Sequence, residues 1–267
     1  MRSIIHGTLL LAVSLPGTPA VSAQISESLA LVTSRPNPNE PYRLFGGRTV
    51  TLPLLIRAPQ PEGLTIRADL VQLTSRLAVP AGEIEVPLSG RPTVGGGTEI
   101  DLAVALPAVN RETDFELRFR SSRPGDRVPQ AAGRIPLRVY PTDLLSPVRA
   151  WAQSHPIRVE DVDGSLIEFF AQQGIGVTAN PEPRGITVYA GPQALQKQSR
   201  SPLRDGETVI LLSERETDTP HFVIERTGRG TTVKVEMQLL DRLTADPLAQ
   251  KTLLAMFQHL IEVNNER

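Results

Sequence analysis

Apolar and polar residues alternate with a period of two in five segments between residues 50 and 119. In the first segment, Leu52, Leu54 and Ile56 occupy every second position. This period places such residues on one face of a β-strand, so that one face of each strand is buried and the other is solvated. Clusters of Pro, Gly and Asn separate the segments, and no helical pattern lies between them. About seven short strands at this spacing predict an all-β, immunoglobulin-like sandwich over residues 24–140.

Cysteine is absent from the 267 residues. Its absence excludes a disulfide framework, a zinc site built from thiolates, an iron–sulfur cluster and a cysteine nucleophile. The 28 Lys and Arg residues nearly balance the 29 Asp and Glu residues, which gives a formal net charge of -1. A chain with this balance lacks the basic character of a general nucleic-acid binder. We therefore expect no nucleic-acid partner, and no cofactor is predicted.

The first 23 residues have the three parts of a secretory signal. Arg2 is followed by the apolar stretch 8–15, and the segment ends with the small residues Val21-Ser22-Ala23. The apolar stretch is far shorter than the roughly 20 residues that a membrane-spanning helix needs. We predict a signal peptide over residues 1–23 and an exported mature chain, periplasmic or extracellular, without an integral membrane segment. A membrane anchor or a buried N-terminal helix is the alternative interpretation.

The periodicity changes beyond residue 141. Residues 164–173 have the pattern of an amphipathic helix, whereas 186–190 and 208–212 have the pattern of buried strands. Asp246-Pro247 provides an N-cap and a first helical residue for a last amphipathic helix. Strands that alternate with helices favour a layered α/β structure. We predict a second, α/β domain over residues 145–267.

The end of this second half carries a resemblance to a known family. The hairpin sequence Gly228-Arg229-Gly230 precedes an apolar strand over 232–239, and Asp246-Pro247 opens the closing helix. This order resembles the end of the class I glutamine-amidotransferase-like domains attached to many exported bacterial enzymes. The resemblance implies a flavodoxin-like, three-layer domain. Catalytic members of that family use a Cys activated by a His and oriented by a Glu, so the lack of Cys implies a non-catalytic relative here.

A second motif, Asp161-Val162-Asp163-Gly164-Ser165-Leu166, resembles the opening of haloacid-dehalogenase-type phosphohydrolases. In that family the two Asp residues act as nucleophile and general acid and help to place Mg²⁺. The chain departs from the family pattern, because Ser213-Glu214-Arg215 stands where an acidic pair is expected. The alternative interpretation is that Asp163 caps the helix that follows it.

Four residues form the candidate ligand site of the predicted sheet. Asp161, Asp163, Gly191 and Glu214 all follow predicted strands, and open α/β sheets bind ligands at the carboxyl ends of their strands. Carboxylates there could hold Ca²⁺ or Mg²⁺, although loop carboxylates are commonly only solvated. No histidine pair has the spacing of metal ligands. We therefore predict no catalytic residue and no resident metal.

These features predict an exported, non-catalytic interaction or scaffold protein with a degenerate amidotransferase-like domain. Its expected partner is a protein or a surface polymer. Two alternatives stay open: a carbohydrate- or ligand-binding accessory module that uses the crevice, and a metal-assisted hydrolase that uses Asp161, Asp163 and Glu214. Trp151, the single tryptophan, is interpreted as interdomain packing before a sugar-stacking platform.

Overall fold

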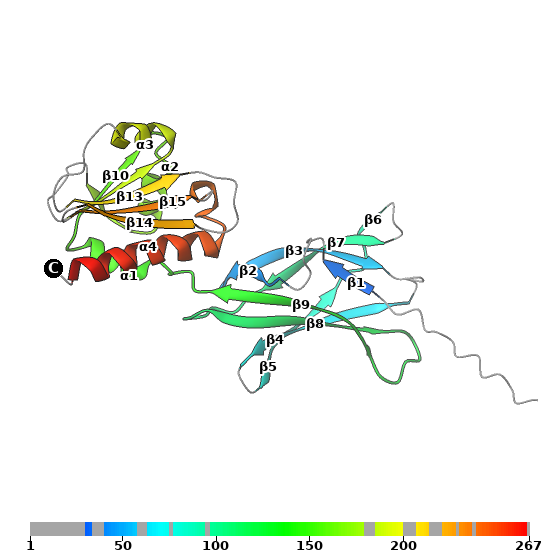
Figure 1. The fold of residues 1–267 in the computed structure, drawn as a ribbon. Helices are drawn as coiled ribbons and strands as arrows, with labels where there is room; N and C mark the ends of the chain where they lie inside the picture. Colours follow the sequence, from blue (N-terminus) through cyan, green and yellow to red (C-terminus); the bar gives the residue numbers. More distant parts are fainter. Residues whose placement is uncertain are drawn as a thin grey trace, which may run out of the picture.

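Two separate clusters of buried apolar side chains divide the molecule, one drawn from positions 42–139 and the other from positions 145–260. Figure 1 shows the two corresponding lobes, one of strands and one in which helices accompany a sheet. The computed structural model describes residues 30–33, 40–57, 63–74, 77–93, 97–178, 185–199, 207–213, 221–227, 230–236 and 239–265.

The described residues of the first unit form nine strands in two sheets. The strands are β1 (Ala30–Thr33), β2 (Tyr42–Phe45), β3 (Thr49–Arg57), β4 (Thr65–Leu73), β5 (Ala78–Val86), β6 (Arg91–Pro92), β7 (Thr98–Ala105), β8 (Thr113–Ser122) and β9 (Gln130–Tyr140). One sheet has the order β1-β3-β7-β6 and the other the order β2-β9-β8-β4-β5. Neighbouring strands are antiparallel, except that β2 runs parallel to β9.

The core of this unit lies between the two sheets. Every second residue along most of β3, β7 and β8 points inward, as Leu52 and Leu54 do on β3, and as Phe115, Leu117 and Phe119 do on β8. All five are at most 2% exposed. The sequence alternation therefore correctly predicts these strands and their packing into a β-sandwich, because only one face of each strand is apolar.

The second unit contains a six-stranded sheet of order β11-β10-β12-β13-β15-β14. Its strands run parallel to their neighbours, except for β14, which is antiparallel to β15. The elements are α1 (Ser146–Ala152), β10 (Ile157–Asp161), α2 (Ser165–Gln172), β11 (Val177–Thr178), β12 (Ile186–Ala190), α3 (Pro192–Ser199), β13 (Thr208–Ser213), β14 (His221–Thr227), β15 (Gly230–Glu236), the 3-10 turn Leu240–Arg242 and α4 (Pro247–Asn265).

The helices of this unit begin and end close to where the sequence predicts. Gly174 follows α2 with a φ of +67°, in the left-handed conformation that terminates many helices. Asp246 Oδ1 accepts a hydrogen bond of 2.8 Å from the backbone N–H of Leu248, which caps α4. The two helices meet in the core, where the rings of Phe170 and Phe257 pack edge to face with centroids 6.2 Å apart.

The prediction that the second unit is a flavodoxin-like, amidotransferase-like domain is wrong. A doubly wound domain of that kind carries layers of helices on both faces of its sheet. In the described residues strands predominate, and such helical layers are not evident. Between β13 and β15, the described residues form the strand β14, which pairs antiparallel with β15, and they form no crossover helix. The sequence pattern identified individual helices but not the layers they would have to form.

The predicted signal peptide, residues 1–23, lies outside the described residues. Within the stretches that are described, no helix combines the length and the apolar character needed to cross a membrane. The division into domains at 24–140 and 145–267 stays a prediction.

Candidate functional site

Two of the four predicted ligand residues lie at one edge of the mixed sheet. Asp161 ends β10 and is paired with Ala190, the last residue of the parallel strand β12, and Gly191 follows directly. The structure therefore brings Asp161 and Gly191 to the same carboxyl edge. Asp163 lies in the exposed turn after β10. Glu214 follows β13 and lies outside the described residues, so the ligand site remains a prediction.

The carboxylate of Asp161 is engaged by the backbone of its own turn. Its Oδ2 accepts a hydrogen bond of 2.7 Å from the N–H of Leu166, and its Oδ1 accepts one of 3.3 Å from the N–H of Asp163. The residue that precedes α2, Gly164, has a φ of +73° and offers no side chain for a cap. Asp161 therefore satisfies a free N–H of the first helical turn. The alternative prediction that Asp163 is the cap is wrong, because the left-handed turn at Gly164 brings the helix start back to the strand end.

Replacement of Asp161 by Ala is expected to lower the free energy of unfolding by about 0.5–2 kcal/mol, the usual range for a lost helix cap. Asp163→Ala is the matched control and is expected to have little effect, since Asp163 contributes only its backbone N–H to this turn. Urea unfolding followed by the fluorescence of Trp151 measures both, because this single tryptophan packs against the core of the same unit. A larger loss for Asp163→Ala would contradict the assignment.

Trp151 lies on the second unit. It packs against the core of that unit, and its ring stacks on the ring of His155 with centroids 4.6 Å apart and an angle of 4° between the planes. The Nδ1 atom of His155 lies 2.9 Å from the hydroxyl of Ser154. In the part of the chain that is described, no three His, Cys, Asp or Glu side chains gather as a possible metal-ligand set.

A groove of about 730 Å³ crosses the outer face of the five-stranded sheet. It is formed by four neighbouring strands, β5, β4, β8 and β9. The residues that line it are Asp69, Val71, Pro80, Glu116, Arg118, Phe119, Arg120, Ala131, Gly133 and Arg134. We call this hollow the sheet-face groove.

Two β-bulges occur beside this groove. Between the pairs Leu70–Gly82 and Val71–Pro80, β5 contains one extra residue, and between Phe119–Gly133 and Arg120–Ala131, β9 does the same. A bulge bends its strand and increases the local twist. Because the bulged strands flank the pair β4 and β8, we attribute the hollow in this face to them.

Charged side chains line the groove, and the carboxylates among them are less exposed than the guanidinium groups. The Nη2 atom of Arg120 lies 2.7 Å from an oxygen of Asp69, and the Nε atom of Arg118 lies 2.7 Å from Glu116. A second arginine, Arg134, lies 3.8 Å from the same Glu116 carboxylate. The Glu116 side chain is 13% exposed, whereas that of Arg134 is 78% exposed. The carboxylates therefore lie deep in the groove and the guanidinium groups lie nearer to solvent.

Sequence reasoning missed the sheet-face groove. The sequence does contain a pattern that points to the groove. Arg118 and Arg120 occupy alternate, outward positions of one strand, and Arg134 lies on the next strand along the chain. The alternation shows that these side chains point away from the core. It does not show which strands are neighbours or where a bulge shifts the register, and these two facts bring the three arginines together.

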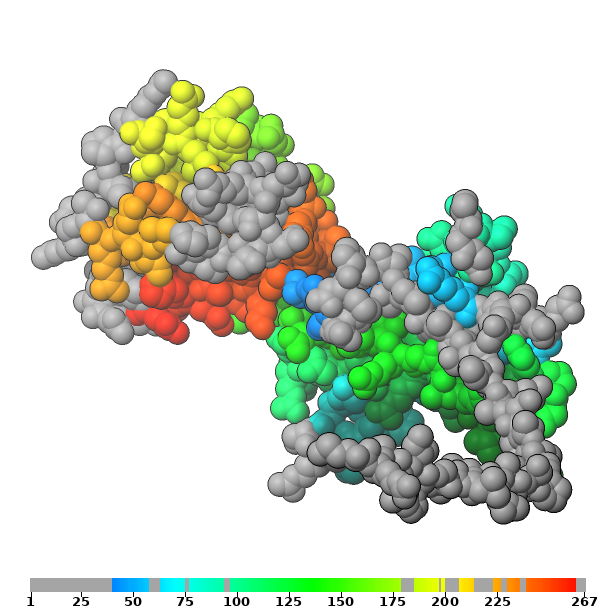
Figure 2. Space-filling model, turned by 45° about the vertical axis from the view of Figure 1, so that its right-hand side comes forward, coloured from blue at the N-terminus to red at the C-terminus, as the bar shows by residue number. Residues whose placement is uncertain are grey.

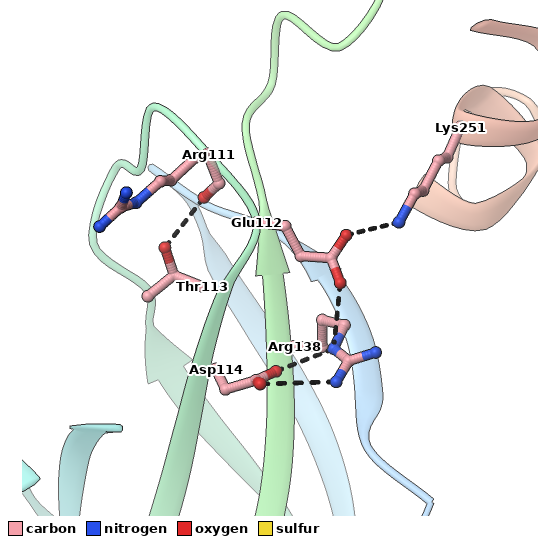
Figure 3. Close-up of polar contacts among 6 residues, drawn as sticks. All are labelled: Arg111, Glu112, Thr113, Asp114, Arg138 and Lys251. Atoms are coloured by element: carbon pink, nitrogen blue, oxygen red, sulfur yellow. Dashed lines mark hydrogen bonds and ion pairs between the residues drawn. The ribbon is translucent and has the colours of Figure 1, made fainter. Parts of the chain in front are cut away.

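The two units meet at a chain of ionic contacts, drawn in Figure 3. Lys251 of α4 places its Nζ 2.6 Å from Glu112, whose other oxygen lies 3.3 Å from the Nε of Arg138. Arg138 also donates a hydrogen bond of 2.8 Å to Asp114. The Lys251 ammonium lies 5.7 Å from the centre of the Tyr140 ring. Helix α4 also contacts β2, and in Figure 2 the orange end of this helix lies next to the sandwich, whereas its red end lies farther from it.

This junction shifts two ionisation equilibria. Burial raises the pKa of Tyr140 above its ordinary value of 10.0, and the negative charge of Glu112 raises it further. The hydrogen bond to Asp114 raises the pKa of Arg138, so its guanidinium stays charged. Since the neutral phenol is favoured in the folded protein, the stabilisation from Tyr140 is present below pH 10 and is lost as the pH rises through its raised pKa.

Comparisons with known proteins give no family. No family model matches the chain, and no curated protein does either, so they lend no support to the amidotransferase-like prediction. Among solved structures, the CooA pilin subunit from enterotoxigenic Escherichia coli matches with a TM-score of 0.26 and 12% identity over 43% of this chain and 98% of its own. A family 123 glycoside hydrolase from Clostridium perfringens has a TM-score of 0.26 and 8% identity over 90% of this chain. The chain spans 45% of that hydrolase. Both scores are too low to carry an argument about fold or function.

Proposed function

We propose that this chain is an exported, non-catalytic interaction or scaffold protein and that it binds a partner through the sheet-face groove. The observation that carries the proposal is the composition of the groove. Val71 is 6% exposed and lies outside the apolar cluster of the sandwich core, and the exposed arginines Arg118, Arg120 and Arg134 line the same groove. An apolar centre with a polar, arginine-rich rim is the usual anatomy of a protein–protein interface.

We also propose that the sandwich, over residues 24–140, is of the immunoglobulin-like type. In that type one sheet has the strand order A-B-E-D and the other contains C, F and G. If β1, β3, β4, β6, β7, β8 and β9 are lettered A to G in chain order, the two sheets follow this arrangement. Strands β2 and β5 then extend the second sheet at its two edges. Such sandwiches occur in many cell-surface domains, which supports an interaction role.

The scaffold part of the proposal rests on the junction. Lys251 of the second unit, over residues 145–267, forms an ion pair with Glu112 of the sandwich. The carboxylate of Glu112 also forms an ion pair with Arg138. Networks of several charges hold a fixed arrangement better than isolated ion pairs. A partner bound in the sheet-face groove would thus lie at a defined position relative to the second unit. The export of the chain is proposed from its N-terminal residues alone.

Site-directed crosslinking tests the binding face, and the absence of cysteine makes it specific. Ala131→Cys places a single thiol in the groove, and Ala103→Cys places one on β7 of the other sheet; both alanines are exposed strand residues. Each variant carries a benzophenone maleimide and is irradiated in an extract of secreted and surface proteins from the source organism. We expect a discrete adduct from position 131 that unlabelled wild-type protein suppresses, and none from position 103.

Equal adducts from both positions, or none from position 131, would contradict the proposed binding face. An adduct from position 131 that carries glycan and no polypeptide would replace the protein partner by a surface polymer. Far-UV circular dichroism of both variants, compared with that of the wild type, controls for the integrity of the sandwich.

A further inference from the structure

We infer that the sheet-face groove recognises an extended peptide segment that carries carboxylate side chains next to small apolar ones. This inference rests on the proposed function and adds the chemistry of the partner.

The groove has an excess of positive charge. Three arginines and two carboxylates line it, and the two carboxylates pair with different numbers of arginines. Asp69 is paired with Arg120, whereas Glu116 lies against both Arg118 and Arg134. One carboxylate cannot neutralise two guanidinium groups, so a positive charge remains at this end of the groove. An anionic group of a ligand would neutralise it.

Arg134 is the residue placed to bind that anion. Its contact with Glu116, at 3.8 Å, is an ion pair longer than a hydrogen bond, and within the described stretches its guanidinium forms no other pair. A guanidinium has five N–H donors in a fixed plane and binds a carboxylate through two parallel hydrogen bonds. Because its side chain is 78% exposed, it can reach a ligand without breaking a folded-state hydrogen bond.

The apolar positions of the groove lining and the glycine beside them fit the main chain and small side chains of a peptide. Val71 is buried there, Pro80 is apolar, and Gly133 has no side chain. Gly133 has a φ of +149°, which L residues rarely adopt, so the bulge on β9 keeps this position without a side chain. The one aromatic residue of the described lining, Phe119, is 1% exposed and belongs to the sandwich core. It therefore offers no stacking surface for a sugar, which favours a peptide over a carbohydrate.

Selection from a phage-displayed random heptapeptide library tests the inference with the full chain immobilised. The wild type is compared with Arg134→Glu, with Arg134→Ala and with the matched control Arg67→Glu. Arg67 lies on β4, is 61% exposed and pairs with Glu83, but it does not line the groove. We expect the wild type and Arg67→Glu to enrich peptides that contain Asp or Glu beside small apolar residues. Arg134→Ala should recover about tenfold fewer of them, the change that a loss of one charged hydrogen-bonded contact of about 1.4 kcal/mol produces, and Arg134→Glu fewer still.

Each outcome of the peptide selection either supports or overturns the inference. Enrichment of neutral or basic peptides, no enrichment of any peptide, or an equal loss in Arg67→Glu would overturn the inference. If the peptide selection fails while the adduct at position 131 forms, the groove binds a partner of other chemistry and the proposed function stands. If acidic peptides bind and compete with no adduct at position 131, the groove recognises such peptides but the proposed binding of a natural partner there is wrong. Far-UV circular dichroism confirms that each variant is folded before selection.

Discussion

Phe170→Ala is expected to lower the free energy of unfolding of the second unit by about 3–5 kcal/mol, the cost of a large-to-small change in a packed core. The Phe170 side chain is fully buried at 0% exposure and packs edge to face against Phe257, so it joins α2 to α4. The cavity left behind removes contacts on both helices, and the surrounding side chains can fill it only in part. Since domains typically have 5–15 kcal/mol of stability in total, this loss would leave the unit marginally folded.

Urea unfolding followed separately by tryptophan fluorescence and by far-UV circular dichroism measures this change. Trp151 packs on the core of the second unit, so its fluorescence reports that unit, whereas circular dichroism reports both units. The matched control is Phe115→Ala in the sandwich, where Phe115 is 2% exposed. It should shift the transition seen by circular dichroism and leave the Trp151 transition closer to that of the wild type. If the control moves the Trp151 transition as far as Phe170→Ala does, the two units unfold as one.

Gly46→Ala is expected to destabilise the sandwich by about 1–3 kcal/mol, the range for added volume in a packed site. A Cβ atom on Gly46 would lie 2.5 Å from the carbonyl oxygen of Pro107 and 3.1 Å from Val139 Cγ1. The carbonyl belongs to the backbone and cannot rotate away. The Gly46 N–H also donates a hydrogen bond of 2.9 Å to the carbonyl of Tyr140, so the segment cannot move without breaking it.

Gly82→Ala is the matched control for this prediction. Gly82 lies on the edge strand β5, and no heavy atom outside Gly82 and its two chain neighbours lies within 4 Å of the position where its Cβ would be. The expected change is within about 0.5 kcal/mol, as for most surface substitutions. Thermal unfolding followed by far-UV circular dichroism compares the two variants. A Gly46→Ala protein as stable as Gly82→Ala would mean that the β2–β3 turn tolerates a shift of its backbone.

The predicted ligand site illustrates how far local sequence patterns reach. The strand-to-turn pattern places Asp161 and Gly191 at the ends of two strands, and the parallel pairing of β10 and β12 does bring them to one edge. The motif also suggests a role for both carboxylates. In the structure the carboxylate of Asp161 caps the start of α2 and Asp163 is exposed, because the turn at Gly164 has a left-handed conformation. A backbone dihedral angle of this kind cannot be read from the spacing of two acidic residues.

The resemblance to amidotransferase-like domains failed for a related reason. It rested on a hairpin, a strand and a capped helix in a fixed order, and each of these local elements is present as β14, β15 and α4. Local order along the chain, however, does not determine how many helices cover a sheet or on which face they lie. These features depend on contacts between residues that are far apart in the sequence.

The sequence by itself determined the elements whose signal is local. A period of two defined the strands of the sandwich and their buried faces, as Leu52 and Phe115 show, and Asp246 marked the start of the last helix. Only the tertiary structure decided which strands are neighbours, where the bulges of β5 and β9 hollow the outer face, and that Arg134 shares a carboxylate with Arg118. The physical reason is that burial of a strand face is encoded by residues two positions apart, whereas strand pairing, groove shape and ion pairing are set by long-range packing of many weak contacts.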